Sequence, residues 1–309
     1  MILTVTLNAA LDVTYPVASL VPHSTHRVES ASARAGGKGV NVARVLHGAG
    51  EPVLATGLAG GVTGAAIRAD LRTAGVPEAL VYLAGESRRT VAVVAADTGD
   101  ATLFNEPGPE VSDAEWAAFL AAYDDLVGRA DVVVCSGSLP PGVATDAYAE
   151  LVTRAGDVPV IVDASGPSLV AAAAAGAALL KPNLPEAVAT TGQQDPVVAG
   201  RTLRDHGAGA VVVSAGADGL VAVTPDGSWR ATPPAPLPGN PTGAGDASVA
   251  ALAAGLRTGM DWPARLRAAV AWSAGAVAAP LAGDVDATTR DRTADAVRIK
   301  EIDAPHTDR

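Results

Sequence analysis

The sequence is poor in cysteine, in aromatic side chains and in basic residues relative to acidic ones. Of its 309 residues one is cysteine and 3% are Phe, Trp or Tyr, and 33 acidic residues against 22 Lys and Arg give a formal net charge of -11. The lone Cys135 excludes an intrachain disulfide and fits a reducing cytoplasm, where we expect the protein to reside. The acidic balance argues against a general nucleic-acid-binding surface.

Long apolar runs and paired metal ligands are also missing. No apolar run free of charge or turn residues approaches the roughly 18 residues that a membrane span needs, so we expect no association with a membrane. Segment 1–5 lacks a basic leader and is typical of a first strand. The five histidines show no spacing that would place two ligands on one helix face.

The stretch 239–246, Gly-Asn-Pro-Thr-Gly-Ala-Gly-Asp, joins a Pro-rich loop to an Ala-rich helical pattern. Gly243, Ala244 and Gly245 are therefore expected at a helix N-terminus, where free backbone amides bind anions. The adjacent Asp246 favours phosphoryl transfer, in which the amides stabilise the moving group and the acid takes a proton. The alternative is an aspartate that caps a helix after a flexible turn.

A second glycine-rich turn lies at 36–43, with the sequence Gly-Gly-Lys-Gly-Val-Asn-Val-Ala. A helix over 40–47 is expected to begin on it. It is not a Walker A loop, because Gly39 rather than Ser or Thr follows the lysine. Backbone amides, Lys38 and Asn41 are suited to gripping a polyol or a phosphosugar. The alternative is a strand-to-helix turn with a solvated lysine.

Strands and helices are predicted to alternate from residue 113 onward. Helical patterns separate buried strands over 132–135, 160–163, 179–181 and 210–214. This order predicts an α/β fold with a doubly wound, mostly parallel sheet flanked by helices. Ligands bind beyond the carboxyl ends of the strands in such sheets. Polar, glycine-bearing stretches fall there repeatedly: Asp12, 136–142, 163–166, 181–186 and 214–219.

Several β-prone segments lie outside the alternating pattern. We expect them to pair as hairpins, with strands over 13–18 and 27–33 and over 90–96 and 101–105. Other expectations are a loop over 57–64, an edge hairpin over 219–231 and a frayed tail from Asp303. We predict a single domain over 1–309, with a small β-sheet lid formed by inserted segments at about 12–34 and 88–105.

The chain resembles the PfkB (ribokinase-like) carbohydrate kinases over nearly its whole length. Segments 36–43 and 242–246 are similar to the family's N-terminal and C-terminal signatures, and 183–186 is similar to its magnesium-associated NxxE motif. Within the family, segments such as 105–109 and 136–142 resemble the branch that phosphorylates sugar phosphates.

Segment 53–61 is similar to the tagatose-6-phosphate kinases of that branch. Ala9 and Thr242 depart from the branch, which usually has Pro and often has Val at these positions. The expected substrate is a phosphorylated ketohexose, tagatose 6-phosphate or fructose 1-phosphate, with fructose 6-phosphate as an alternative.

The resemblance implies a phosphotransferase that uses ATP and Mg²⁺. It implies that Asp246 is the base for the acceptor hydroxyl and that Gly243, Ala244 and Gly245 supply the backbone amides of the anion hole. It assigns sugar hydroxyls to Asp12, Gly37, Lys38 and Asn41. It assigns the substrate's existing phosphate to Arg88 and Ser138, with Arg27 as a weaker candidate. The ATP side would be lined by Lys181, Asn183, Ser214, Gly216 and Gly219, with Glu186 ordering Mg²⁺ through water.

Dimerisation through the lid is common in the family and would cover the lid's sheet edges, so a homodimer is expected. Other functions stay open at this stage. A dinucleotide-binding oxidoreductase fits poorly, because the GxGxxG-like stretch follows a loop and ends in Ser248. Arg88 argues against a kinase of an unphosphorylated sugar or nucleoside, and Asp246 against a non-catalytic sugar-binding regulator. Lys181 and Glu186 could instead form an exposed ion pair.

Overall fold

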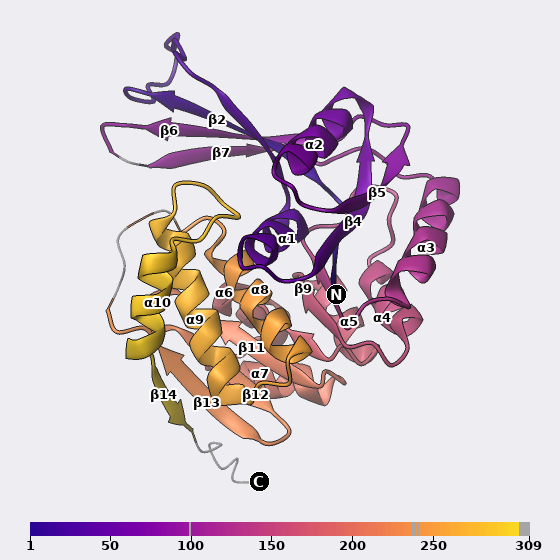
Figure 1. The fold of residues 1–309 in the computed structure, drawn as a ribbon, viewed down its shortest axis with the longest axis vertical. Helices are drawn as coiled ribbons and strands as arrows, with labels where there is room; N and C mark the ends of the chain where they lie inside the picture. Colours follow the sequence, from indigo (N-terminus) through magenta and orange to yellow (C-terminus); the bar gives the residue numbers. More distant parts are fainter. Residues whose placement is uncertain (99, 236–238, 240, 303–309) are drawn as a thin grey trace.

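A computed structural model describes residues 1–98, 100–235, 239 and 241–302. These residues form a large ten-stranded sheet and a separate four-stranded sheet (Figure 1). Gly99 in the second predicted hairpin, four residues of the Pro-rich loop (236–238 and 240) and the expected tail from Asp303 lie outside the described residues.

The large sheet is mostly parallel, as predicted. Its strands are β1 (Ile2–Thr6), β4 (Val53–Gly60), β5 (Glu78–Leu83), β8 (Val132–Ser136), β9 (Val160–Asp163), β10 (Leu179–Leu180), β11 (Ala210–Ser214), β12 (Leu220–Thr224), β13 (Gly227–Thr232) and β14 (Arg298–Glu301). They lie in the order β14-β13-β12-β11-β10-β9-β8-β1-β4-β5. Neighbours from β11 to β5 run parallel, and β12, β13 and β14 add antiparallel pairs. The strand order reverses beside β1, which is where such sheets open a ligand crevice.

Helices cover both faces of this sheet. One face packs against α1 (Lys38–Gly48), α2 (Gly61–Thr73), α8 (Ala244–Arg257) and α9 (Trp262–Ala278). The other packs against α3 (Asp113–Val127), α4 (Ala147–Ala155), α5 (Pro167–Ala174), α6 (Leu184–Thr191) and α7 (Pro196–Asp205). Alternate residues of a strand serve the two cores, so Val134 faces the first group and Val133 the second. Helix α10 (Ala287–Ala296) packs on α9. None of the helices in the described ranges combines the length and apolar character needed to cross a bilayer.

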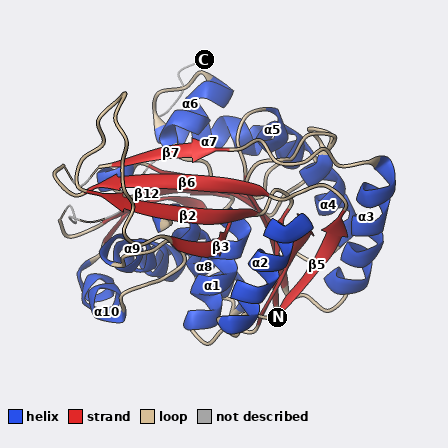
Figure 2. Ribbon diagram, turned by 90° about the horizontal axis from the view of Figure 1, so that it is seen from above, coloured by secondary structure: helices blue, strands red, loops and turns tan. Residues whose placement is uncertain are grey.

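The small sheet contains β2 (Ala10–Val17), β3 (Ser32–Gly36), β6 (Arg88–Ala95) and β7 (Ala101–Asn105) in the order β3-β2-β6-β7. The β2–β3 and β6–β7 pairs are the predicted antiparallel hairpins, and they join through the parallel pair β2–β6. The sheet projects from the large one on the side of α8, α9 and α10, and from above it lies across the molecule (Figures 1 and 2).

Three local predictions are wrong. The strand expected over 27–33 begins at Ser32, because residues 20–31 form a largely exposed loop beyond the sheet. The loop expected over 57–64 is instead the end of β4 and the start of α2. Its glycines allow close backbone approach, since a Cβ on Gly57 would lie 2.0 Å from the carbonyl oxygen of Thr6. The hairpin of β12 and β13 is not an edge, because β14 pairs with β13.

Helix α1 packs tightly against β1, and glycine makes this contact possible. A Cβ on Gly39 would lie 2.4 Å from Thr6 Oγ1 and 2.6 Å from the carbonyl oxygen of Val5. Gly37 precedes the helix with a φ of 100°, a left-handed conformation that suits glycine. The turn predicted at 36–39 therefore brings the start of α1 onto the carboxyl end of β1.

A pair of substitutions in α1 tests this packing. Gly39→Ala should lower the free energy of unfolding by about 1–3 kcal/mol, the usual cost of overpacking. Gly48→Ala, in the same helix but with nothing within 4 Å of the added methyl, should raise it by up to about 1 kcal/mol. Urea unfolding of both variants measures the difference, and equal midpoints would contradict the packing argument.

Candidate active site

The N-terminus of α8 has a geometry suited to binding an anion. Gly243 caps the helix in the left-handed conformation with φ of 85°, and a Cβ there would lie 3.0 Å from Ala282 Cα. The first amides of a helix have no intrahelical partner and face outward with the positive end of its dipole; in this structure the Ala244 amide donates a 3.2 Å hydrogen bond to the carbonyl oxygen of Pro241. The Lys181 ammonium lies 3.6 Å from the place where a Cβ on Gly245 would stand. The cradle therefore combines amide donors with a buried cation, since Lys181 is 3% exposed.

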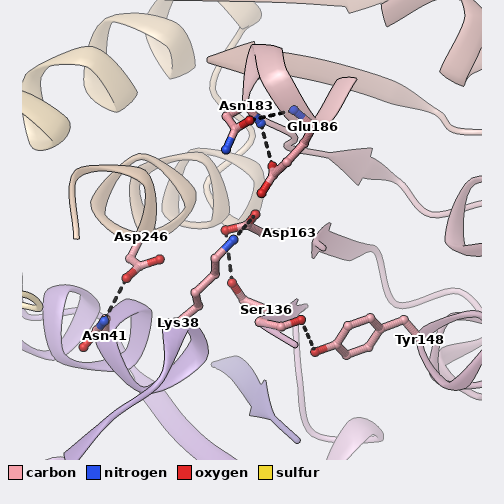
Figure 3. Close-up of polar contacts among 9 residues, drawn as sticks. Lys38, Asn41, Ser136, Tyr148, Asp163, Asn183, Glu186 and Asp246 are labelled. Carbon is pink, nitrogen blue, oxygen red and sulfur yellow. Dashed lines mark hydrogen bonds and ion pairs between the residues drawn. The ribbon is translucent and has the colours of Figure 1, made fainter. Parts of the chain in front are cut away.

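Asp246 lies in the first turn of the same helix and is 6% exposed. Its Oδ2 accepts a hydrogen bond of 2.8 Å from Asn41 Nδ2 on α1 (Figure 3). Burial, reinforced by the nearby Asp163, raises the pKa of Asp246 from 3.8 to about 7, against the opposing effects of Asn41, Lys38 and Lys181. A carboxylate with a pKa near neutrality is suited to accept a proton during a reaction.

Lys38 extends from the start of α1 toward Asp163 at the end of β9 (Figure 3). Its Nζ lies 3.1 Å from Asp163 Oδ1, and Ser136 Oγ donates 3.2 Å to Asp163 Oδ2. Burial lowers the pKa of Lys38, but the hydrogen bond to Asp163 and the charges of Asp163, Glu186 and Asp246 oppose this effect, and the pKa is raised overall. The lysine is therefore held charged in the middle of the site.

Asp163 is 2% exposed and central to the site, but no role was predicted for it from the sequence. The stretch 163–166 was expected only to be one of the polar segments that follow strands. The available signal was an acidic residue closing a buried strand, at the edge of the sheet where ligands bind.

Asn183 and Glu186 form a capping box at the start of α6. Glu186 Oε2 accepts a 2.9 Å hydrogen bond from the backbone N–H of Asn183, and Asn183 Oδ1 accepts one of 2.8 Å from the backbone N–H of Glu186 (Figure 3). This arrangement satisfies otherwise free amides and fixes both side chains at the cleft. The alternative of an exposed Lys181–Glu186 ion pair is wrong, because Lys181 is buried.

Arg88 and Asp12 lie at the small-sheet end of the site. Arg88 Nε donates a 3.1 Å hydrogen bond to the carbonyl oxygen of Asn8. The side chain of Asn8 in turn donates a 3.1 Å hydrogen bond from Nδ2 to Ser138 Oγ. Burial raises the pKa of Asp12, and a hydrogen bond from Thr90 and the charge of Arg88 oppose the rise. The absence of a side chain on Gly36 makes room for this carboxylate, since a Cβ there would lie 1.9 Å from Asp12 Oδ2.

A cleft of about 1470 Å³ joins these groups between the small sheet and the carboxyl ends of the large one. Its walls include nearly all of the predicted site residues: Asp12, Gly37, Lys38, Asn41, Arg88, Lys181, Asn183, Glu186, Ser214, Gly216, Gly219, Gly243, Ala244, Gly245 and Asp246. Two predicted residues are not among its lining residues. Ser138 reaches the site through its hydrogen bond with Asn8, and Arg27 lies exposed in the loop before β3. Lining residues that the sequence analysis missed include Arg34, Asp70, Thr90, Asn105 and Asp163.

Carboxylates that could support Mg²⁺ are few. Among the described residues no group of three His, Cys, Asp or Glu side chains is arranged to hold a metal ion. Mg²⁺ often keeps several waters and binds through one or two carboxylates together with substrate phosphates. Glu186 lines the cleft and fits that mode of binding, whereas the two oxygens of Asp163 are held by Lys38 and Ser136.

Comparison with known proteins identifies the family. A family model described as pfkB family carbohydrate kinase matches residues 4–289, and the chain belongs to this family. Phosphofructokinase-2 from Escherichia coli is 28% identical with a TM-score of 0.88, over 95% of this chain and 98% of that one. A possible 1-phosphofructokinase from Thermotoga maritima is 26% identical with a TM-score of 0.85, over 98% and 100%. A putative phosphofructokinase from Staphylococcus aureus is 27% identical with a TM-score of 0.83, over 99% and 100%. The predicted ribokinase-like fold is confirmed.

The raised pKa of Asp246 predicts how stability depends on pH. The folded state holds this proton up to about pH 7, whereas an unfolded aspartate releases it near 3.8. The contribution of Asp246 to stability is therefore complete below about pH 4 and is lost as pH rises through about 7. Each pKa unit corresponds to about 1.4 kcal/mol. Asp246→Asn, which stays neutral, should be more stable than the parent by about 2–4 kcal/mol at pH 8 and similar to it at pH 4.

Urea unfolding of the two proteins between pH 4 and 8 measures this difference. Asp125→Asn, on the exposed face of α3, serves as the control and should follow the parent at every pH. A stability difference between Asp246→Asn and the parent that does not change with pH would contradict the assigned pKa.

Proposed function

We propose that the protein is an ATP-dependent sugar-phosphate kinase, which transfers the γ-phosphoryl group of ATP to a hydroxyl of a phosphorylated ketohexose. The observation that supports this most directly is the buried Asp246 inside the amide cradle of α8, with Lys181 beside it. Membership of a carbohydrate kinase family and the likeness to phosphofructokinases point to the same reaction.

In the proposed reaction Asp246 is the base. The acceptor oxygen attacks the γ-phosphorus, the bond from phosphorus to the ADP oxygen breaks, and the hydroxyl proton passes to Asp246. The amides of Gly243, Ala244 and Gly245 stabilise charge on the transferring group. Asn41 holds the Asp246 carboxylate through the 2.8 Å hydrogen bond, which leaves Oδ1 for the acceptor hydroxyl. Bound Mg²⁺ would neutralise charge on the ATP phosphates, with Glu186 ordering it through water.

The two ends of the cleft suit two different ligands. At the small-sheet end we assign sugar hydroxyls to Asp12, Gly37, Lys38 and Asn41. Arg88 and Ser138 would hold the existing phosphate, because a guanidinium pairs well with phosphate. At the other end Lys181 would face the phosphates of ATP, and the nucleotide would lie along Asn183, Ser214, Gly216 and Gly219. Arg27 is the weakest assignment, since it lies outside the cleft of its own chain.

The small sheet is proposed to act as a lid and to pair with a second copy of the chain. Its cleft-facing residues, among them Thr14, Ala92 and Leu103, alternate with residues on the opposite face. That opposite face has apolar side chains, including Val91 and Phe104, which lie side by side on β6 and β7. Phe104 is 57% exposed, so a homodimer through this face would remove apolar surface from water.

Loss of the base should abolish most turnover without unfolding the protein. Asp246→Asn cannot accept the proton, so kcat should fall by about 10²–10⁴, the usual contribution of a general base. The assay is Mg²⁺-dependent ATP consumption with fructose 1-phosphate, tagatose 6-phosphate, fructose 6-phosphate or free fructose. Asp125→Asn is the control. One phosphosugar should dominate by kcat/KM; activity on free fructose alone, or full activity of Asp246→Asn, would refute the proposal.

Arg88 and its neighbour provide a test of substrate binding. Arg88 lines the cleft, whereas Arg89 is exposed and does not. Arg88→Ala should raise KM for the phosphosugar by about 10–100-fold, as expected for the loss of a charge-assisted contact, with KM for ATP within about twofold. Arg89→Ala should change neither. An equal rise in both KM values for Arg88→Ala would contradict its phosphate role.

A further inference from the structure

A second cavity of about 450 Å³ adjoins the proposed active site, and Arg34 lines both. It is bounded by α1, the end of α2, α9, α10 and the segment that joins α9 to α10. Three arginines line it, Arg34, Arg44 and Arg290, together with His47, and Asp284 is the one acidic residue in the lining. Each of these arginines is paired with a carboxylate: Arg34 with Asp284, Arg44 with Asp70 and Arg290 with Asp291.

Arg44 is the buried member of the group and is 6% exposed. It donates through Nη2 to Asp70, but its Nε has no hydrogen-bond partner among the described residues. Burial, together with the neighbouring charge of Arg34, lowers the pKa of Arg44. The charge of Arg44 is paired with Asp70, but a buried donor without an acceptor is costly, and an oxygen of an anion in the cavity would accept from Nε.

The other two arginines also have capacity for an anion. Arg290 donates through Nε to Asp291, a neighbour whose side chain is 68% exposed and therefore well solvated. Arg34 forms a two-pronged pair with Asp284, with Nη1 to Oδ2 at 2.9 Å and Nη2 to Oδ1 at 2.5 Å. The single lining carboxylate thus occupies the place on Arg34 that a second anion would use.

We propose that this cavity binds the phosphate group of a small phosphomonoester, at a site separate from the cleft. Arginine is the preferred partner of phosphate because its planar fork donates two parallel hydrogen bonds. A phosphate would compete with Asp284 for Arg34 and with the solvated Asp291 for Arg290, and it would give Arg44 Nε an acceptor. The volume lies in the usual range for small-molecule sites, and Trp272 provides a broad apolar wall for the rest of the ligand.

The position of the cavity gives the site a route to the cleft. Ala282 packs against Gly243 at the anion cradle, and the next residues, Gly283 and Asp284, line the cavity. Arg34 lines both the cavity and the cleft. A phosphate that takes Arg34 away from Asp284 would loosen the tie between β3 and this segment. The two effects are reciprocal, so a ligand in the cleft that stabilises the Arg34–Asp284 ion pair would weaken phosphate binding in the cavity.

The test is a binding measurement that does not depend on kinase activity. Inorganic phosphate and glycerol 3-phosphate are titrated into Arg88→Ala, in which the phosphate arginine of the cleft is absent. Calorimetry gives the stoichiometry, and tryptophan fluorescence reports on Trp272, with Trp272→Phe added to identify the signal. A fluorescence change that disappears in Trp272→Phe is expected for phosphate in this cavity, and any further site in the calorimetry is assigned to the amides of α8.

Three further substitutions in the same background separate this cavity from general surface attraction. Arg290→Gln should weaken binding by about fivefold or more, as expected for a charge-assisted contact. Asp284→Asn should tighten it severalfold by freeing Arg34. Arg292→Gln, an exposed arginine of α10 outside the cavity, should leave it within about twofold. Equal losses for Arg290→Gln and Arg292→Gln, weaker binding by Asp284→Asn, or no binding in the Arg88→Ala background would overturn the proposal.

Discussion

The other charged groups of the site are arranged around one buried carboxylate, that of Asp246. Asp246 sits at the start of α8, removed from water, and is held by Asn41 from a different helix. Such a group is costly to ionise unless positive charge is near, and Lys38 and Lys181 supply that charge. Lys38 is itself paired with Asp163 at the end of β9, so the charge near Asp246 depends on a contact between distant parts of the chain.

The parallel sheet brings these groups together. Asp163 closes β9, Lys181 follows β10, and Lys38 opens the helix after the small sheet. Because the carboxyl ends of parallel strands meet at one edge, residues far apart in sequence meet there without any long loop. The strand order reverses beside β1, and Gly39 lets α1 lie directly against that strand. The small sheet then covers the opening and adds Asp12 and Arg88 from its own strands.

Local patterns in the sequence predicted the parts of the site that depend on backbone geometry. Gly243 and Gly37 adopt left-handed conformations at helix starts, and the alternation of apolar strands and helices predicted the sheet. Contacts between distant segments were beyond such patterns. Nothing near Asp163 indicates that its partner is Lys38, and nothing near Gly57 distinguishes a glycine in a strand from one in a loop. The pairing of β14 with β13 was also not predicted, because the segment Arg298–Glu301 is short and mostly polar and does not stand out as a strand.

The Arg34–Asp284 pair bears on the order in which the protein is made. It joins residues 250 positions apart, and the Asn41–Asp246 bond joins residues 205 apart. A chain growing on the ribosome completes its first hairpins long before these partners exist. These two contacts of the site can therefore form only after residue 284 has been synthesised. Because such distant contacts form late, an incomplete chain lacks the arrangement of charges that defines the site.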